Sequence, residues 1–272
     1  MSRQIGYFAV GLTAALAALI FWAPGAAVGE INKNKRKNTG FLERTYTDSD
    51  GNEFKYSLFI PHAYNKDDED TKYPVILFLH GHKQEGTDGV KPTRVGLGPY
   101  IKENEETFDF IVVFPQSQER WEADTADSKR AMTILNHVLK SYNCDPDKVT
   151  VTGNSQGGHG AWCLACSHPN RWAAMVIVAG FAGDSLDDAG KIKHIPARFY
   201  HGETDQKVKI AKGKAMFGAL KEAGGDPEAI WDPGEDYPVS DEYPNGTHNA
   251  DWFNEIYANK DLYDWLRNQS RK

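Results

Sequence analysis

The chain has 272 residues, of which 40% are apolar and 25% are charged, and its net charge at pH 7 is -7. These values are typical of one globular domain of ordinary size and exclude a disordered or fibrous chain. Because the chain is acidic and has no basic patch beyond the short run at residues 33–37, nucleic acid is not expected as a partner.

The first 29 residues have the pattern of an export signal. Arg3 supplies a positive charge, residues 5–23 are almost wholly apolar, and Ala27 and Gly29 occupy the small-residue positions before the expected cut. The general secretory route would then deliver the protein to the periplasm or to the outside of the cell. A retained membrane anchor is the alternative, because an apolar run of about 19 residues is long enough to span a bilayer.

After the apolar segment, residues 30–40 are expected to form a polar spacer and residues 41–272 a single folded domain. Residues 54–61 alternate apolar and polar positions, which predicts a half-exposed edge strand. Short continuous apolar runs predict strands that are buried on both faces, as in a parallel sheet, at residues 75–79, Ile111–Phe114, 148–152 and 175–179. Shorter strands are expected at residues 199–202 and 229–231.

Helical patterns lie between these strands, at Ala126–Ser141, Gln156–Ser167 and residues 208–222, and another helical region begins around Asp251. Strands and helices therefore alternate along the chain. This order predicts a mostly parallel, doubly wound α/β sheet with right-handed crossovers.

Ser155 lies in the segment Gly-Asn-Ser-Gln-Gly, between a predicted strand and a predicted helix. A nucleophilic serine on a sharp strand-to-helix turn has this G-x-S-x-G pattern. Gly153 and Gly157 remove the Cβ atoms that would collide where the chain reverses direction. Ser155 is therefore the candidate nucleophile.

A serine nucleophile needs a general base, because its hydroxyl is almost fully protonated at neutral pH. Where such a turn occurs in a doubly wound sheet, the acid follows the serine and the histidine comes last. Asp205, on the loop after the strand at residues 199–202, is the candidate acid, and His248 is the candidate base. Asp184 is the alternative acid, since it follows the strand that comes after the nucleophile helix.

His201 and His159 are expected to have structural roles. His201 precedes Asp205 too closely to reach the same imidazole position, and His159 would sit one turn into the helix that follows Ser155. His80 and His82 are separated by one residue, but without a third convergent ligand they make a weak zinc site. No metal or cofactor is therefore expected.

Acyl transfer also needs two N–H groups that stabilise the negative charge on the carbonyl oxygen. The backbone of Gln156, the residue after the candidate nucleophile, is one expected donor. His82, in the loop that follows the strand at residues 75–79, is the other, with Gly81 as its neighbour.

Several segments together resemble a known family. They are FLHGHKQEGTDG, FPQSQERW, the turn around Ser155, AGFAGD, FYHGETDQKV and GTHNADWFNEIYANKDLYDWL. In this order they resemble the secreted carboxylesterases and predicted peptidases of the α/β-hydrolase fold that are related to polyhydroxybutyrate depolymerases and feruloyl esterases. The resemblance covers residues 41–272 and implies the same roles for Ser155, Asp205, His248, Gln156 and His82. The chain departs from the family at Gln156, where many members have Met, and in a longer segment at residues 232–246.

The resemblance implies an exported serine esterase that works through an acyl-enzyme, with residues 41–272 as its catalytic domain. The connection at residues 179–190 is too short for a large lid, which suits esters on polysaccharides, such as feruloyl or acetyl groups. Trp121, Tyr237 and Tyr243 could stack on a sugar or an aromatic acyl group, or could equally anchor loops. The alternatives are a serine peptidase of the prolyl-oligopeptidase type, a polyhydroxyalkanoate depolymerase, and a catalytically inactive binding module. A membrane is expected as a partner only if the N-terminal segment is retained.

The three cysteines allow two states. In an exported protein, a disulfide from Cys144 to Cys163 or Cys166 is geometrically plausible. Alternatively, all three are buried thiols that pack as small apolar side chains. The C-x-x-C spacing does not predict a redox site, since it lies inside a helix rather than at its start.

Overall fold

The computed structural model describes residues 38–271. The expected export signal or anchor at residues 1–29, and most of the expected spacer, lie outside this part of the chain. Eight strands form one sheet in the order β1-β2-β4-β3-β5-β6-β7-β8. They are β1 (Gly40–Thr47), β2 (Glu53–Ile60), β3 (Tyr73–Leu79), β4 (Ile111–Phe114), β5 (Cys144–Asn154), β6 (Ala174–Val178), β7 (Ala197–Gly202) and β8 (Glu228–Asp232).

The six strands from β3 to β8 are parallel, whereas β2 pairs antiparallel with both β1 and β4. The prediction of a mostly parallel α/β sheet is thereby confirmed. The prediction that residues 54–61 form the edge strand was wrong, because β1 pairs along the whole length of β2 and is itself the edge. The last five residues of β2 are consequently buried.

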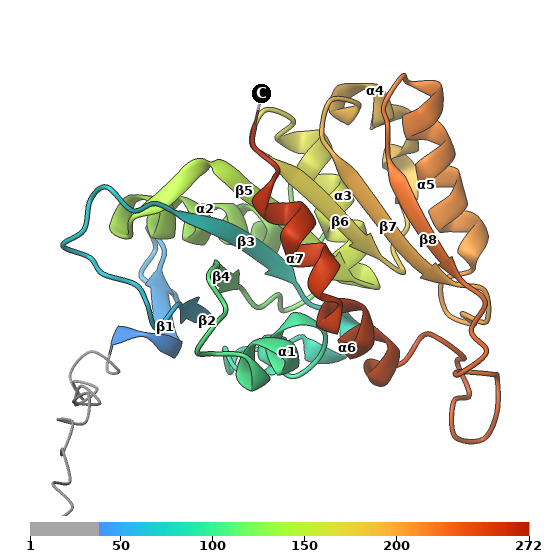
Figure 1. Ribbon diagram of the computed structural model, residues 1–272, viewed down its shortest axis with the longest axis horizontal. Helices are drawn as coiled ribbons and strands as arrows, with labels where there is room; N and C mark the ends of the chain where they lie inside the picture. The colour runs from blue at the N-terminus through green and yellow to red at the C-terminus, as the bar shows by residue number, and fades with distance from the viewer. Residues whose placement is uncertain (1–37, 272) are drawn as a thin grey trace, which may run out of the picture. The chain divides into compact units, whose positions relative to one another are not determined.

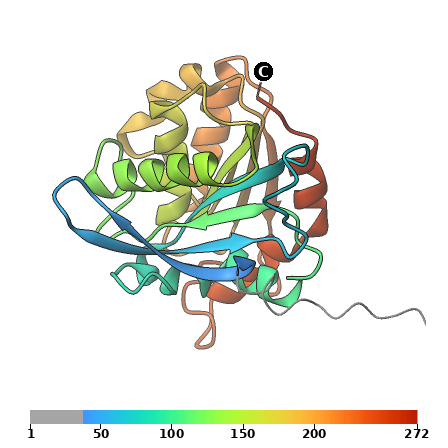
Figure 2. The same cartoon turned by 90° about the vertical axis from the view of Figure 1, so that its left-hand side faces the viewer.

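Helices cover both faces of the sheet (Figures 1 and 2). The helices are α1 (Leu97–Glu103), α2 (Ala126–Ser141), α3 (Gln156–Ser167), α4 (Ala189–Ile192), α5 (Ile210–Glu222), α6 (Ala250–Ala258) and α7 (Lys260–Arg267). Three short 3₁₀ helices are η2 (His82–Gln84), η3 (Lys91–Thr93) and η4 (Gly183–Asp188). The predicted helices at residues 126–141 and 156–167 are confirmed with the same bounds.

Each face of the sheet contributes to its own hydrophobic core. One core joins alternate residues of the strands, such as Val75, Leu77 and Val151, to α2, α3, α4 and α5. The other core joins the intervening residues, such as Ile76 and Phe78, to α1, α6 and α7. Burial of one such side chain contributes about 1.5–3 kcal/mol to folding. Because helices cover both faces of the sheet, apolar residues are favoured at every position of its central strands.

The structure also shows the state of the three cysteines and whether any helix is suited to crossing a membrane. Cys144, Cys163 and Cys166 are all buried and unpaired, so the disulfide alternative was wrong. Cys144 and Cys166 pack into the hydrophobic core as small apolar groups, whereas the Cys163 Sγ lies 3.5 Å from His159 Nε2. No helix between residues 38 and 271 combines the length and the apolar character that crossing a membrane would need.

Candidate active site

Ser155 occupies the sharp turn between β5 and α3. Its φ of 55° and ψ of −118° lie outside the regions that non-glycine residues favour. Such a conformation costs on the order of 1–3 kcal/mol and persists only where the surroundings hold it. Here the N–H of Ser155 donates to the carbonyl oxygen of Val178 at 2.8 Å, which ties the turn to the end of β6.

The two glycines of the turn are required by close backbone approach. A Cβ atom on Gly153 would lie 2.4 Å from the carbonyl oxygen of Leu79, and one on Gly157 would lie 1.8 Å from the same oxygen. Both distances are far shorter than van der Waals contact. The turn can therefore rest against the end of β3 only because positions 153 and 157 lack side chains.

The structure brings Ser155, His248 and Asp205 together from three separate segments. The Ser155 Oγ lies 2.9 Å from His248 Nε2. On the other side of the ring, His248 Nδ1 lies 2.7 Å from Asp205 Oδ2. The Asp205 side chain is fully buried, whereas that of His248 remains 13% exposed. This arrangement has the contacts of a nucleophile, a base and an orienting acid.

Asp205 is held as an anion by the loop after β7. Its Oδ1 accepts the N–H groups of Lys207 and Val208, both at 2.8 Å. Burial by itself would raise the pKa of the carboxyl, but hydrogen bonds with His201 and His248 outweigh it and lower the pKa to about 2. Asp205 is therefore charged at neutral pH and can stabilise a protonated His248.

The loop that carries His248 packs closely on the loop that carries Asp205. The N–H of Thr247 donates to Thr204 Oγ1 at 3.0 Å. A Cβ atom on Gly246, which has a φ of +58°, would lie 2.2 Å from the Thr204 carbonyl oxygen. Directly after His248, Asn249 caps α6 by accepting the N–H of Trp252 at 2.8 Å. The histidine is thus fixed between a packed loop and a capped helix.

The two expected oxyanion donors follow two neighbouring strands of the sheet, β5 and β3. Gln156 is the first residue of α3, so its N–H has no acceptor within that helix. His82 lines the same cavity as Ser155 and begins η2. The side chain of Gln156 points away from solvent: it is 8% exposed, and neither of its amide atoms has a hydrogen-bond partner.

His80 anchors the loop that carries His82, a role that the sequence did not reveal. Its Nδ1 donates to the Gly81 carbonyl oxygen at 2.7 Å, and its Nε2 accepts the Ser117 N–H at 3.0 Å. Burial lowers the pKa of His80 to about 4, so the ring is neutral at pH 7 and can keep both roles. The loop is therefore preorganised by a buried side chain below it.

A cavity of about 420 Å³ contains Ser155 and His248. The rest of its wall comes from the loop after β3, the loop after β7 and residues 245–253, together with Val95 and Asn154. This volume is within the range of pockets that hold small ligands. The site lies at the carboxyl ends of β3, β5 and β7, which is where open parallel sheets bind ligands.

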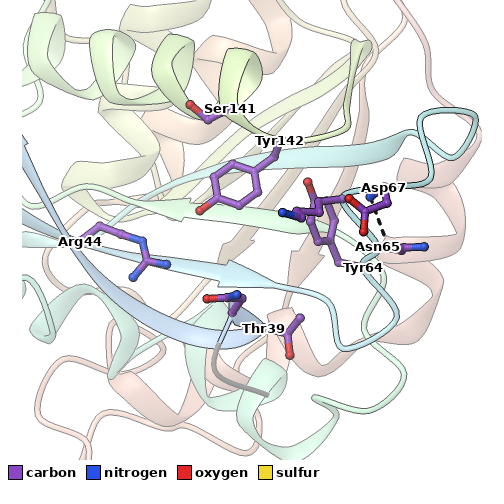
Figure 3. Close-up of a pocket in the computed structure, with 9 residues that line it drawn as sticks. Thr39, Arg44, Tyr64, Asn65, Asp67, Ser141 and Tyr142 are labelled. Atoms are coloured by element: carbon purple, nitrogen blue, oxygen red, sulfur yellow. Dashed lines mark hydrogen bonds between the residues drawn. The ribbon is translucent and has the colours of Figure 1, made fainter. Parts of the chain in front are cut away.

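A second cavity, of about 460 Å³, lies at the opposite end of β5 (Figure 3). It is lined by Arg44 of β1, by Tyr64 and Asn65 after β2, and by Tyr142 just before β5 begins. Ser155 and His248 do not line it. We therefore place the candidate active site at the first cavity.

The expected substrate contact of Trp121 needs correction. Trp121 is fully buried, its Nε1 donates to the His80 carbonyl oxygen at 3.0 Å, and its ring packs edge-on against His80 at 5.1 Å. It supports the loop from beneath and cannot stack on a substrate. Tyr237 and Tyr243 pack against each other at 5.0 Å in the loop before His248, and neither lines the cavity.

The alternative acid and the other histidines are placed elsewhere. Asp184 is exposed on η4 and has no hydrogen bond to His248. His201 is buried, and its Nε2 lies 2.7 Å from the Val208 carbonyl oxygen and 3.5 Å from Asp205 Oδ2. His201 therefore stabilises the loop that carries Asp205, which is the structural role expected for it.

Glu122, His159 and Cys163 form the one group in the described part of the chain that has the makings of a metal site. His159 Nδ1 lies 2.8 Å from the Phe181 carbonyl oxygen, and its Nε2 lies 2.9 Å from Glu122 Oε2. Both ring nitrogens therefore face acceptors, which a doubly protonated imidazole satisfies without a metal. Burial opposes this charge, but contacts with Cys163, Glu122 and Phe181 raise the pKa of His159 to about 9.

The raised pKa of His159 predicts a loss of stability at alkaline pH. Because the folded value of about 9 exceeds the unfolded value of 6.5, the contribution is complete below pH 6.5 and is lost as the pH rises through 9. We expect His159→Gln to remove roughly 2–3 kcal/mol of the difference in unfolding free energy between pH 6.5 and 10. Thermal unfolding at a series of pH values measures this, with the exposed His137→Gln as control. Equal pH slopes in wild type and His159→Gln would contradict it.

Two solved structures that are similar to this chain are hydrolases. A thermostable esterase has a TM-score of 0.73 and 27% identity, and the match covers 85% of this chain and 63% of that one. An acylaminoacyl peptidase from Pyrococcus horikoshii has a TM-score of 0.61 at 13% identity, covering 87% of this chain and 43% of that one, and shows the fold alone. The domain has the α/β-hydrolase fold.

Sequence comparison then gives the family. The model of the Esterase family matches residues 48–263, and the chain belongs to that family. Feruloyl esterase D from Neurospora crassa is 25% identical over 225 residues, which cover 79% of this chain and 73% of that protein. Acetylxylan esterase A from Aspergillus oryzae is 32% identical over 87 residues, which cover 28% of each chain. The protein is a carboxylic ester hydrolase.

Proposed function

We propose that the protein hydrolyses carboxylic esters through an acyl-enzyme formed on Ser155. The observation that carries the proposal is the continuous contact from Ser155 Oγ to His248 Nε2, at 2.9 Å, and from His248 Nδ1 to Asp205 Oδ2, at 2.7 Å. Membership of the Esterase family supports the same chemistry.

In the first half of the reaction, His248 Nε2 accepts the hydroxyl proton as Ser155 Oγ attacks the ester carbonyl carbon. Asp205 holds the Nδ1 proton of His248 and stabilises the positive charge on the ring. The N–H groups of Gln156 and His82 bind the oxygen that becomes negative. The C–O bond to the alcohol then breaks, and His248 returns the proton to the leaving oxygen.

In the second half, a water molecule replaces the alcohol. The water oxygen attacks the acyl carbon while His248 takes one proton from the water. The bond between the acyl carbon and Ser155 Oγ then breaks. The serine recovers its proton and the acid is released. No step requires a metal or an organic cofactor.

We infer that the esters are feruloyl or acetyl groups on polysaccharides. The names of feruloyl esterase D and acetylxylan esterase A support this class. We also infer that the protein is exported, with residues 1–29 as signal, residues 30–40 as spacer and residues 41–272 as catalytic domain. The apolar N-terminal run supports export, and so does a relative from Arthroderma benhamiae named as a secreted protein, 23% identical over 231 residues that cover 70% of this chain and 23% of that protein.

Covalent labelling tests the proposal directly. A fluorophosphonate probe phosphonylates only an activated serine, so we expect mass spectrometry to find one adduct, on Ser155. His248→Ala should lose the labelling, because the base that activates the hydroxyl is gone. A folded protein without an adduct on Ser155 would favour the inactive binding module instead.

A further inference from the structure

Among the described residues, two lysines and no carboxylate line the cavity that contains Ser155, although the protein is acidic. Lys83, on the loop after β3, and Lys207, on the loop after β7, both line it. No Asp or Glu side chain is among the described residues of its wall. The chain as a whole carries a net charge of -7. The lysines of the wall are therefore opposite in sign to the net charge of the molecule, and the carboxylates behind the wall, Asp205 and Glu85, face His248 and His82.

Both lysines are free to act on a ligand. Within residues 38–271, neither ammonium group forms an ion pair, whereas Lys91, Lys191, Lys214 and Lys221 each lie within 4 Å of a carboxylate. The acid nearest along the chain to Lys83 is Glu85, whose Oε1 lies 2.9 Å from His82 Nδ1. Glu85 is thus engaged with His82 and is not part of the cavity wall.

The rest of the polar wall is uncharged and suits hydroxyl groups. Asn154, directly before Ser155, lines the cavity and is only 2% exposed, yet its Oδ1 has no hydrogen-bond partner. That oxygen has less than 1 Å² of accessible surface, so a ligand in the cavity does not reach it. Gln84 and Asn245 also line the wall, whereas the Asn249 amide is engaged with the Trp252 N–H and the Gly246 carbonyl oxygen.

We propose that the preferred substrates are esters that carry a free carboxylate close to the ester bond, as ester-modified acidic glycans do. Lys83 and Lys207 bind the carboxylate from two sides of Ser155. The proposal rests on the esterase function proposed above and specifies the substrates of that site. Charge attraction of this kind depends on salt, because the lysines are exposed.

A matched pair of acetyl esters tests the proposal. The substrates are 4-acetoxybenzoate, which carries one negative charge, and 4-acetoxybenzamide, which has nearly the same shape and no charge. The readout is the ratio of their kcat/KM values. We expect the wild type to favour the charged ester, and Lys83→Gln and Lys207→Gln each to lower the ratio about 5-fold, as expected for one charge lost at a partly solvated site. Raising NaCl from 0.05 to 0.5 M should lower the wild-type ratio as well.

Lys209→Gln is the control, because Lys209 is exposed and near Lys207 but does not line the cavity. The proposal is overturned if the double variant Lys83→Gln/Lys207→Gln keeps the wild-type ratio within 2-fold. Such a result, with hydrolysis still dependent on Ser155, would leave the esterase function intact. Absence of hydrolysis of both esters would instead overturn the proposed function itself.

Acetate release from polymers identifies the source of the carboxylate. Acetylated polygalacturonate provides the charge on every sugar, and acetylated glucomannan provides none. Lysine-dependent preference for the polygalacturonate supports an acidic glycan as substrate. The same rate on both polymers, with no change in the lysine variants, overturns the assignment to acidic glycans.

Discussion

Replacing Ser155 with alanine is expected to lower kcat/KM for ester hydrolysis by at least about 10⁴-fold. The change removes the Oγ that lies 2.9 Å from His248 Nε2 and leaves the backbone turn in place. The remaining hydrolysis by Ser155→Ala is expected to come from substrate binding and from the two N–H donors. Hydrolysis of 4-nitrophenyl acetate by purified protein measures the loss, and circular dichroism shows whether the fold is retained.

Ser167→Ala is the matched control for this experiment, because Ser167 is the exposed last residue of the same helix, α3. Its rate and unfolding temperature should equal those of the wild type. If folded Ser155→Ala kept more than a tenth of the wild-type rate, Ser155 would not be the nucleophile.

Replacing Asp205 with asparagine is expected to lower kcat about 10³–10⁴-fold, even though the side chain keeps its size. Asp205 Oδ1 accepts two backbone N–H groups, and Oδ2 faces His248 Nδ1 at 2.7 Å. The oxygen of asparagine is best placed on the two N–H groups. Its NH₂ group then faces His248, which favours the tautomer that carries its proton on Nε2. A ring in that form cannot accept the proton of Ser155.

Asp184→Asn separates the two candidate acids. Asp184 is exposed on η4, so its substitution should leave the rate within about 2-fold of wild type. A loss of activity in Asp184→Asn but not in Asp205→Asn would reverse the assignment. Thermal unfolding of both variants shows whether either loss comes from the fold.

Much of the fold could be predicted because its signals are local. Strands that are buried on both faces appear in the sequence as continuous apolar runs. The bounds of β4 were predicted correctly from such a run. The bounds of α2 and α3 follow from strong signals at their starts, a capping Thr125 and the turn at Ser155. The strand β1 was missed because it is half exposed and its residues alternate weakly, so only its pairing with β2 reveals it.

The candidate site was predictable where chain order carries information. Ser155, Asp205 and His248 meet in space, as their order along the chain had led us to expect, and their catalytic roles stay predictions for the experiments above. Trp121 was predicted as a substrate contact because the sequence does not show whether a tryptophan in a loop faces solvent or supports a neighbouring loop. Its burial under His80 depends on contacts between β3 and β4 loops that are far apart in the sequence.

The electrostatics of the site could not be predicted for the same reason. Lys83 and Lys207 are separated by more than a hundred residues and become neighbours of Ser155 only when three loops converge on one cavity. The pairing of His159 with Glu122 likewise joins α3 to the loop before α2. Sequence patterns describe elements one at a time, whereas these contacts exist only between elements.

The buried, unpaired thiols of Cys144, Cys163 and Cys166 have a practical meaning for how the protein is made. Because no cross-link holds the described part of the chain, its folding needs neither an oxidant nor a disulfide isomerase. The same native state should form in a reducing cytoplasm and in an oxidising compartment, and reductants should not lower its unfolding temperature. We therefore expect residues 38–271 to fold in ordinary bacterial hosts without an oxidising compartment.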